Sequence, residues 1–343
     1  MKYKKLPNTE IEVSQICLGT MTFGEQNTLE EAHQQLNYSL DKGVNFIDTA
    51  EVYAVPTKAE TYGETERILG TWLKENRSKV VLASKIAGPN RSLDYIRPDL
   101  SFSKENLNKA LEQSLERLQT DYLDIYQLHW PERKTNFFGK RGFKQDATDL
   151  WEDNFAQIIE TLEGFKKEGK IRHFGVSNET PWGLMRFCEE ARKNDWEKPI
   201  TIQNPYSLLN RTFETGLAEI SHREDIGLLA YSPLAFGILS GKYLQEQPDD
   251  ARLTLYPQMK RYSNLEVSEV VKKYASLGND FGISLAQLSL AFIRQQPFVT
   301  STIIGATKML QLKENIESVD VELSEELLNE IEKIHTSQPN PAP

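Results

Sequence analysis

Four ionisable side chains lie at or just beyond the ends of three apolar runs in the first 130 residues. Asp48 ends the first run and Tyr53 follows it by five residues, Lys85 ends the second run, and His129 ends the third. Parallel strands that are neighbours in a sheet present their carboxyl ends at one rim. If the runs are such strands, a carboxylate, a phenol, an ammonium group and an imidazole converge there. The runs are residues 45–48, 80–85 and 122–129.

These four groups are suited to protonating an oxygen atom that becomes negatively charged. A tyrosine hydroxyl ordinarily has a pKa near 10, and an adjacent ammonium favours the phenolate, so we expect Lys85 to lower the pKa of Tyr53. Asp48 would keep Lys85 charged, and His129 can donate a hydrogen bond to a substrate oxygen. Charge of this kind develops when hydride adds to a carbonyl carbon. No side chain supplies hydride, so the chemistry requires a bound reduced nicotinamide.

Each of the four residues taken alone also has an ordinary structural explanation. Asp48 can cap the segment that follows its strand, and Tyr53 can be a half-buried packing residue. Lys85 can be solvated or form a structural ion pair, and His129 can be a hydrogen-bonded core histidine. The combination of these residue types at the second, third and fourth of eight predicted strands is poorly explained by coincidence.

The composition indicates a water-soluble globular enzyme. Of the 343 residues, 39% are hydrophobic and 26% are charged, which is ordinary for that class. The formal net charge of −10 disfavours nucleic acids and anionic membranes as partners. No apolar run approaches the roughly 20 residues that span a bilayer, and the N-terminus lacks the apolar region of a secretory signal. The two cysteines, Cys17 and Cys188, form no metal or redox motif, so we expect a cytoplasmic protein without a metal site.

Alternating apolar runs and helical patterns predict eight strand–helix units. This pattern favours a (β/α)₈ TIM barrel, since an open dinucleotide-binding sheet would carry a G-x-G-x-x-G turn after its first strand. We expect one domain over residues 1–343, with an N-terminal β-hairpin before the barrel. Long loops at 131–153 and 232–262 follow strands four and seven, an extra helix covers 325–335, and the Pro-rich tail 338–343 is expected to be mobile. The predicted strands are 16–19, 45–48, 79–85, 122–129, 171–176, 200–203, 226–231 and 302–304, and the predicted helices are 28–41, 64–76, 103–118, 155–168, 181–193, 213–223 and 309–317.

Several longer stretches resemble the aldo-keto reductase family, in the order in which that family carries them. The resemblance runs from about residue 2 to residue 335, and it implies a (β/α)₈ reductase whose catalytic tetrad of Asp, Tyr, Lys and His corresponds to Asp48, Tyr53, Lys85 and His129. The stretches are Leu18–Gly24, Gly43–Ala50, Leu118–Trp130, Gly169–Asn178 and Tyr231–Gly237. Within the family, Gly19–Gln26, Ile202–Arg211 and Gln296–Ile316 are similar to one bacterial member.

The resemblance also implies a cofactor site that follows the strand ends. Ser177, Asn178 and Gln203 offer donors and acceptors for a nicotinamide carboxamide, and Tyr231 can stack on the ring. The next loop would hold the pyrophosphate with its backbone N–H groups, and Gly237 would allow a close approach. A plain turn is the alternative explanation for Ser232 and Pro233. The further residues of the implied cofactor site are Gly19, Thr20, Met21, Gln26, Asp48, Ser232, Pro233, Leu234, Ala235, Phe236, Lys242, Arg252, Gly305, Thr307, Gln311, Glu314 and Asn315.

The predicted helix after strand eight bears on the choice between NADP and NAD. In the family its start holds the adenosine end, with Glu314 and Asn315 receiving the adenine amino group. Many members carry an arginine at the position of Gln311, where it grips the ribose 2′-phosphate. Thr307, Gln311 and the helix N-terminus can still bind phosphate, with Arg252 reaching over, so NADPH is favoured and NAD is less excluded than usual. Alternatively, Gln311 and Lys308 are ordinary surface residues of this helix.

The expected substrate is a small carbonyl compound. Phe23, Tyr53, His129 and Trp130 are predicted to line its pocket, with Phe137 and Phe138 of the long loop nearby. A second hypothesis is a regulatory subunit that binds NADP(H) and signals redox state with little turnover. His129 argues for the enzyme, because a protein kept only for binding could lose it. The sequence assigns no oligomeric state.

Overall fold

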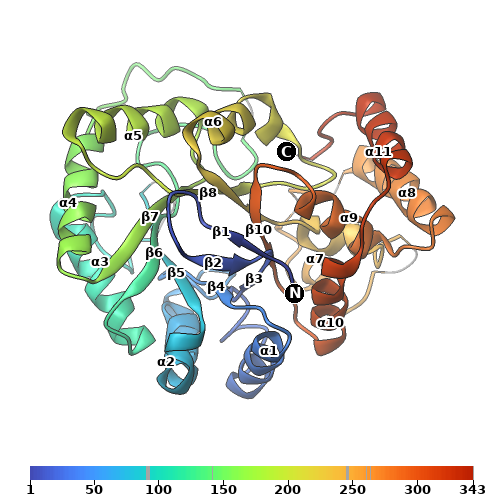
Figure 1. Ribbon diagram of the computed structural model, residues 1–343, viewed down its shortest axis with the longest axis horizontal. Helices are drawn as coiled ribbons and strands as arrows, with labels where there is room; N and C mark the ends of the chain where they lie inside the picture. Colours follow the sequence, from blue (N-terminus) through green and yellow to red (C-terminus); the bar gives the residue numbers. More distant parts are fainter. Residues whose placement is uncertain (90–92, 141, 245–246, 260, 263, 343) are drawn as a thin grey trace.

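Eight parallel strands close into a barrel that helices surround (Figure 1). The structure is a computed structural model, and it describes residues 1–89, 93–140, 142–244, 247–259, 261–262 and 264–342. Around the barrel the strands follow the order β10-β3-β4-β5-β6-β7-β8-β9, as the TIM-barrel prediction requires. They are β3 (Ile16–Gly19), β4 (Phe46–Asp48), β5 (Val81–Ile86), β6 (Leu123–Leu128), β7 (Ile171–Ser177), β8 (Thr201–Pro205), β9 (Gly227–Tyr231) and β10 (Val299–Ile304).

The strand register aligns the ends that carry chemistry. Asp48 lies opposite Ala83 of β5, two residues before Lys85. Lys85 in turn pairs with Gln127, two residues before His129. One rim of the barrel therefore carries all three strand ends.

The helices cover the outside of the barrel, and several begin at a side chain that caps the first turn. Thr28 forms a capping box with Glu31, and the hydroxyl groups of Ser103 and Thr180 accept hydrogen bonds from first-turn N–H groups, which satisfies donors that the helix cannot pair. The helices are α1 (Leu29–Asp41), α2 (Glu64–Asn76), α3 (Lys104–Leu118), α4 (Phe155–Lys167), α5 (Pro181–Asn194), α6 (Leu217–Glu224), α7 (Arg252–Leu255), α8 (Leu265–Asp280), α9 (Leu285–Arg294), α10 (Met309–Glu317) and α11 (Glu325–Ser337). Short 3₁₀ turns are η1 (Ala59–Thr61), η2 (Arg77–Lys79), η3 (Thr212–Thr215), η4 (Ala235–Ser240) and η5 (Ser318–Asp320).

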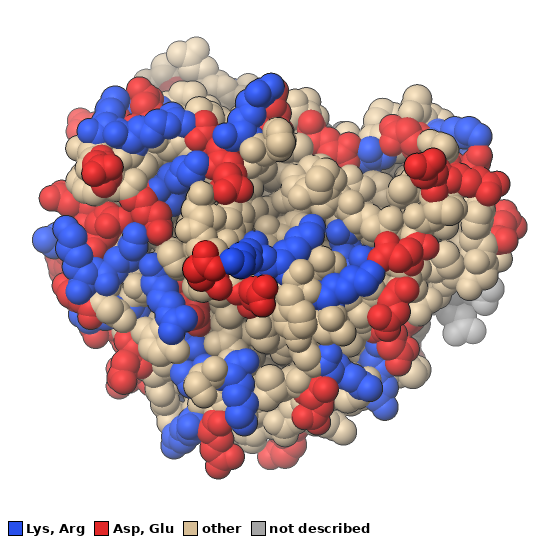
Figure 2. All heavy atoms as spheres, in the orientation of Figure 1, with Lys and Arg blue, Asp and Glu red and all other residues tan. Residues whose placement is uncertain are grey.

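The predicted N-terminal hairpin is present and closes the amino-terminal end of the barrel. It consists of β1 (Tyr3–Lys5) and β2 (Glu12–Ser14), and its Leu6 and Val13 side chains pack with Cys17 and Phe46 inside the barrel. Figure 1 views the molecule from this side, so the strand carboxyl ends face away from the viewer. Figure 2 shows a row of Lys and Arg side chains across the middle of this face, with Asp and Glu side chains next to them.

The segment between β9 and β10 contains two helices, α8 and α9, that were not predicted from the sequence. In α8 the buried positions are Val267, Val270, Val271 and Tyr274, a helical spacing that starts at an N-cap asparagine. Helix α9 follows after only four residues and is buried along nearly its whole length. A short, mostly apolar segment such as α9 is difficult to distinguish from a buried strand by sequence alone.

The C-terminal tail packs on the barrel instead of extending from it. The Asn340 side-chain oxygen accepts a hydrogen bond from the Arg211 N–H, and the Ala342 N–H donates to the Leu209 carbonyl. Ala342 is buried. A mobile tail was expected for residues 338–343, and these contacts differ from that expectation. Pro343 lies outside the described residues. Throughout the described part of the chain, no helix combines the length and apolar character needed to cross a membrane.

Candidate active site

The structure brings the four predicted rim residues together. The Lys85 Nζ atom donates to Asp48 Oδ2 at 2.6 Å and to the Thr49 carbonyl at 2.7 Å. The same Nζ atom lies 5.1 Å from the centroid of the Tyr53 ring. The His129 and Tyr53 rings meet edge to face, with centroids 5.7 Å apart and planes at 81°. Three strand ends and one loop thus supply an acid, an amine, a phenol and an imidazole to one location.

Two glutamines fix the second oxygen of Asp48. Asp48 Oδ1 accepts hydrogen bonds from Gln203 Nε2 at 2.8 Å and from Gln127 Nε2 at 3.2 Å. Gln203 is among the predicted cofactor residues, whereas sequence reasoning missed Gln127. Gln127 lies inside the run that ends at His129, and its inward direction follows only from the barrel register. Both oxygens of the Asp48 carboxylate are therefore hydrogen-bonded, and its ion pair holds the Lys85 ammonium near the Tyr53 ring.

The expected lowering of the Tyr53 pKa by Lys85 is wrong. Burial, followed by the negative charge of Asp48, raises the pKa of Tyr53 well above 10.0. The ion pair explains the difference, because Asp48 at 2.6 Å offsets part of the Lys85 charge, and burial is then the main effect on the Tyr53 pKa. In this state Tyr53 is a protonated donor.

Ultraviolet difference spectroscopy can test whether the pKa of Tyr53 is raised. We expect the wild type and the Tyr53→Phe variant to give the same phenolate absorbance up to pH 10, because the raised pKa keeps Tyr53 protonated there. The folded state then binds more protons than the unfolded state above pH 10, so Tyr53 makes stability fall as the pH rises through that range. A phenolate signal from Tyr53 below pH 9 would contradict the prediction.

The predicted nicotinamide residues form a connected set beside His129. Asn178 Nδ2 donates to the His129 carbonyl at 2.9 Å, and its Oδ1 accepts from the Tyr231 hydroxyl at 2.6 Å. The Ser177 hydroxyl donates to the Gln203 carbonyl at 2.9 Å. Asn178 adopts a positive φ of 55°, which asparagine tolerates better than most residues. The structure therefore brings Ser177, Asn178, Gln203 and Tyr231 into one group next to the four rim residues.

The loop after β9 has an unusual backbone and three nearby cations. Ser232, Ala235, Phe236 and Gly237 all have positive φ values, a geometry that turns successive N–H groups toward one side of a loop. A Cβ atom added at Gly237 would come within 3.1 Å of Lys242 Nζ, so this glycine permits the lysine to lie against the loop. The remaining residues of the predicted loop are Pro233 and Leu234.

The cations of this segment make no ion pair with a carboxylate among the described residues. Burial and the charge of Arg252 lower the pKa of Lys242, and Arg252 itself lies 5.7 Å from the Phe236 ring centroid. Sequence reasoning missed Arg261, which offsets the effect of burial on Tyr231, whose pKa rises to about 12. In a protein of net charge −10, partly buried cations without an ion-paired carboxylate are suited to an anionic ligand.

The polar side chains after β10 form hydrogen bonds or ion pairs with other residues of the protein. Gln311 Oε1 accepts from the Thr307 N–H at 3.2 Å, and Glu314 Oε1 accepts from the Ser284 hydroxyl at 2.7 Å. Asn315 is buried and its Nδ2 lies 3.5 Å from the Gly305 carbonyl oxygen. Lys308 forms an ion pair with Asp250 of the segment after β9. Gln311 and Thr307 are thus bonded to each other at the start of α10. Glu314 accepts a hydrogen bond from Ser284, the residue that caps α9.

The segment after β3 supports the rim. Gly19 packs against β10, where an added Cβ atom would lie 2.7 Å from Ile303 Cγ2. The Thr20 hydroxyl donates to the Asp48 carbonyl at 2.9 Å, so this buried residue holds the acid through its backbone. The Met21 carbonyl accepts from the Val55 N–H, and the Gln26 N–H donates to the Thr22 carbonyl.

The aromatic wall differs from the prediction in one residue. Trp130 is buried beside His129, with ring centroids 4.9 Å apart, and contacts Phe138 of the long loop. Phe23, in contrast, has no exposed surface and belongs to the core between barrel and helices. A side chain buried there cannot line a pocket at the rim. Tyr53, His129 and Trp130 of the predicted wall thus lie together, whereas Phe23 lies in the core.

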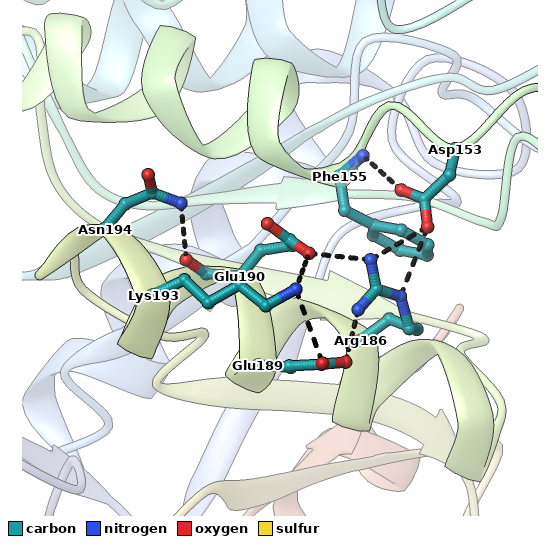
Figure 3. A network of polar contacts seen from close by, with 7 residues as sticks. All are labelled: Asp153, Phe155, Arg186, Glu189, Glu190, Lys193 and Asn194. Carbon is teal, nitrogen blue, oxygen red and sulfur yellow. Dashed lines mark hydrogen bonds and ion pairs between the residues drawn. The ribbon is translucent and has the colours of Figure 1, made fainter.

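Two arginines fix the long loop after β6 to α5 and to the residues just before it. Arg133 makes a bidentate ion pair with buried Glu179 at 2.5 and 3.0 Å. At the end of the loop, Arg186 binds Asp153 together with Glu189 and Glu190, as Figure 3 shows. Bidentate arginine contacts give directional as well as electrostatic stabilisation. The loop that follows His129 is therefore held at both ends.

Comparisons with known proteins agree with this geometry. Residues 15–336 match the profile described as the Aldo/keto reductase family. The chain is 49% identical to the protein named Protein tas of Escherichia coli over the full length of both chains. It is 32% identical to an uncharacterized oxidoreductase of Bacillus subtilis, over 97% of this chain and 96% of the relative. It is also 32% identical to a probable voltage-gated potassium channel subunit beta of Oryza sativa, over 99% and 98%. The chain belongs to the aldo/keto reductase family of oxidoreductases.

Proposed function

We propose that the protein reduces the carbonyl group of an aldehyde or ketone with NADPH. The observation that carries the proposal is the convergence of Asp48, Lys85, Tyr53 and His129 at the carboxyl rim of the barrel, where barrel enzymes hold their active sites. When bound, the reduced nicotinamide would supply hydride to the carbonyl carbon.

Each of the four residues has a separate role in the reaction at the carbonyl oxygen. Tyr53 is protonated in the free protein and donates its proton to that oxygen as general acid. Lys85, held by Asp48, stabilises the phenolate that remains. His129 donates a hydrogen bond that orients the oxygen, and Trp130 contributes an apolar wall. Ser177, Asn178 and Gln203 would hold the nicotinamide, with Tyr231 against its ring.

NADP(H) is the proposed cofactor, and NAD is the less favoured alternative. The support is the set of cations after β9, namely Lys242, Arg252 and Arg261, which lack carboxylate partners among the described residues. At the adenosine end, Thr307 precedes α10, Gln311 lies in its first turn, and Glu314 and Asn315 lie in its second half.

Replacing Gln311 by Arg should strengthen the preference for NADPH. A guanidinium can bind a phosphate bidentately where the glutamine amide cannot. We expect the Kd for NADPH to fall about tenfold while the Kd for NADH stays within twofold, measured by titration of protein fluorescence. Lys313→Arg is the matched control on the same helix. Equal changes for both nucleotides would contradict the assignment of this position to the 2′-phosphate.

The experiment that tests the function is loss of NADPH absorbance with a panel of aldehydes, ketones and quinones. A second candidate, an NADP(H)-binding redox-sensing subunit with little turnover, is favoured by the relative named as a probable potassium channel subunit beta. Tight NADPH binding without turnover would support that candidate and contradict the reductase. We propose a cytoplasmic location, because both cysteines are unpaired thiols.

A further inference from the structure

A buried ion pair lies behind the segment that joins Asp48 to Tyr53. Glu51 belongs to this segment, and its carboxylate binds Arg97 through two hydrogen bonds of 2.7 and 2.8 Å. Glu51 is completely buried and Arg97 is 2% exposed. Nothing in the proposed reaction uses either charge, so the pair requires a separate explanation.

Glu51 connects this segment to the end of β5. Its N–H donates to the Lys85 carbonyl at 3.1 Å, and its Oε1 accepts from the Ala87 N–H at 2.6 Å. The Ile86 carbonyl between them accepts from the His129 N–H at 3.0 Å. The end of β5 is therefore bonded to the Glu51 segment on one side and to His129 on the other.

Tyr53 depends on the same segment for its position. Its N–H donates to the Ala50 carbonyl at 3.1 Å, so residues 50–53 form a tight turn with Glu51 inside it. The side chain of Glu51 fixes one flank of this turn to Arg97. On the other flank, the Tyr53 ring contacts His129 and approaches Lys85. A shift of Glu51 would change the separation of the phenol from its two neighbours.

Stability alone is a weak explanation for this pair. Removing two charges from water costs several kcal/mol per ion, and neutral replacements of a buried pair are often as stable. The Nε atom of Arg97 is also buried without a hydrogen-bond partner among the described residues, which adds to the cost. Three directional hydrogen bonds to the two oxygens of one carboxylate do, however, specify a geometry.

We propose that Glu51 and Arg97 are positioning residues that fix the Tyr53 hydroxyl relative to Lys85 and His129. The inference rests on the proposed role of Tyr53 as proton donor. Loss of the pair should therefore lower kcat, which loss of a merely stabilising contact would not do. Displacement of a reacting group by about 1 Å can cost about 100-fold in rate.

The test uses the neutral double variant Glu51→Gln/Arg97→Met, which leaves no unpaired buried charge. We expect kcat for carbonyl reduction to fall about 30-fold, with KM and the Kd for NADPH within about twofold of wild type. The matched control is Asp124→Asn/Arg77→Met, a pair 2.8 Å apart near the amino end of β6. We expect it to change Tm but not kcat. Arg97→Lys, which keeps the charge, should recover part of the rate.

A second measurement does not depend on turnover. In protein labelled with fluorotyrosine, the fluorine NMR signal of Tyr53 is assigned by its absence in Tyr53→Phe. We expect this signal to move in the Glu51/Arg97 double variant and to stay in place in the Asp124/Arg77 control. A double variant with unchanged kcat and an unmoved Tyr53 signal overturns the inference. A wild type without turnover overturns the proposed function instead, and the NMR comparison still decides whether the pair positions Tyr53.

Discussion

Replacing Tyr53 by Phe lowers kcat for carbonyl reduction by about 1,000-fold, in the middle of the range for loss of a positioned general acid. The phenol is the group in the cluster that the structure holds protonated, and its pKa lies well above 10.0 because of burial and Asp48. Phe keeps the ring that packs against His129 and removes only the donor. Stopped-flow or steady-state measurement of NADPH consumption gives kcat, and titration gives the Kd for NADPH.

The affinity for NADPH should stay within about twofold of wild type in this variant, because the cofactor loop and its cations are not altered. Tyr122→Phe provides the matched control, since Tyr122 lies at the opposite end of the barrel between Arg77 and Arg172 and should not affect kcat. Turnover of Tyr53→Phe at more than a tenth of the wild-type rate would remove Tyr53 from the role of acid. Retained turnover together with a weakened NADPH affinity would instead indicate that Tyr53 serves the cofactor.

The positions of Asp48, Lys85 and His129 could be predicted from the sequence because each ends a short apolar run. A buried strand of a parallel barrel is apolar along its length, so an ionisable residue at its end is conspicuous. The spacing between Asp48 and Tyr53 indicated a loop but not the direction of the phenol. That direction depends on Glu51 and Arg97, which are 46 residues apart and carry no sequence pattern that links them.

The electrostatic prediction failed for a reason that residue types alone cannot reveal. A lysine beside a tyrosine lowers the tyrosine pKa less when a carboxylate already offsets part of its charge. Here Asp48 lies 2.6 Å from Lys85, and Gln127 and Gln203 hold the carboxylate in place. Phe23 illustrates the same limit for packing, since its position after β3 suggested the rim whereas the fold turns it into the core.

Replacing Lys85 by Met is expected to affect both rate and stability, and the two effects can be separated. The substitution leaves Asp48 buried without its countercharge, which costs about 3–5 kcal/mol of unfolding free energy. It also removes the cation that stabilises the Tyr53 phenolate, so we expect kcat to fall about 100-fold or more. Urea unfolding and NADPH consumption measure the two quantities.

The double variant Lys85→Met/Asp48→Asn distinguishes these two consequences. Asn can still accept hydrogen bonds from the two glutamines and carries no charge, so most of the lost unfolding free energy should return. The rate should remain low, because neither neutral side chain can stabilise a phenolate. A double variant that regains stability and rate together would show that Lys85 acts only by neutralising Asp48. Recovery of stability alone would assign Lys85 to the proton transfer from Tyr53.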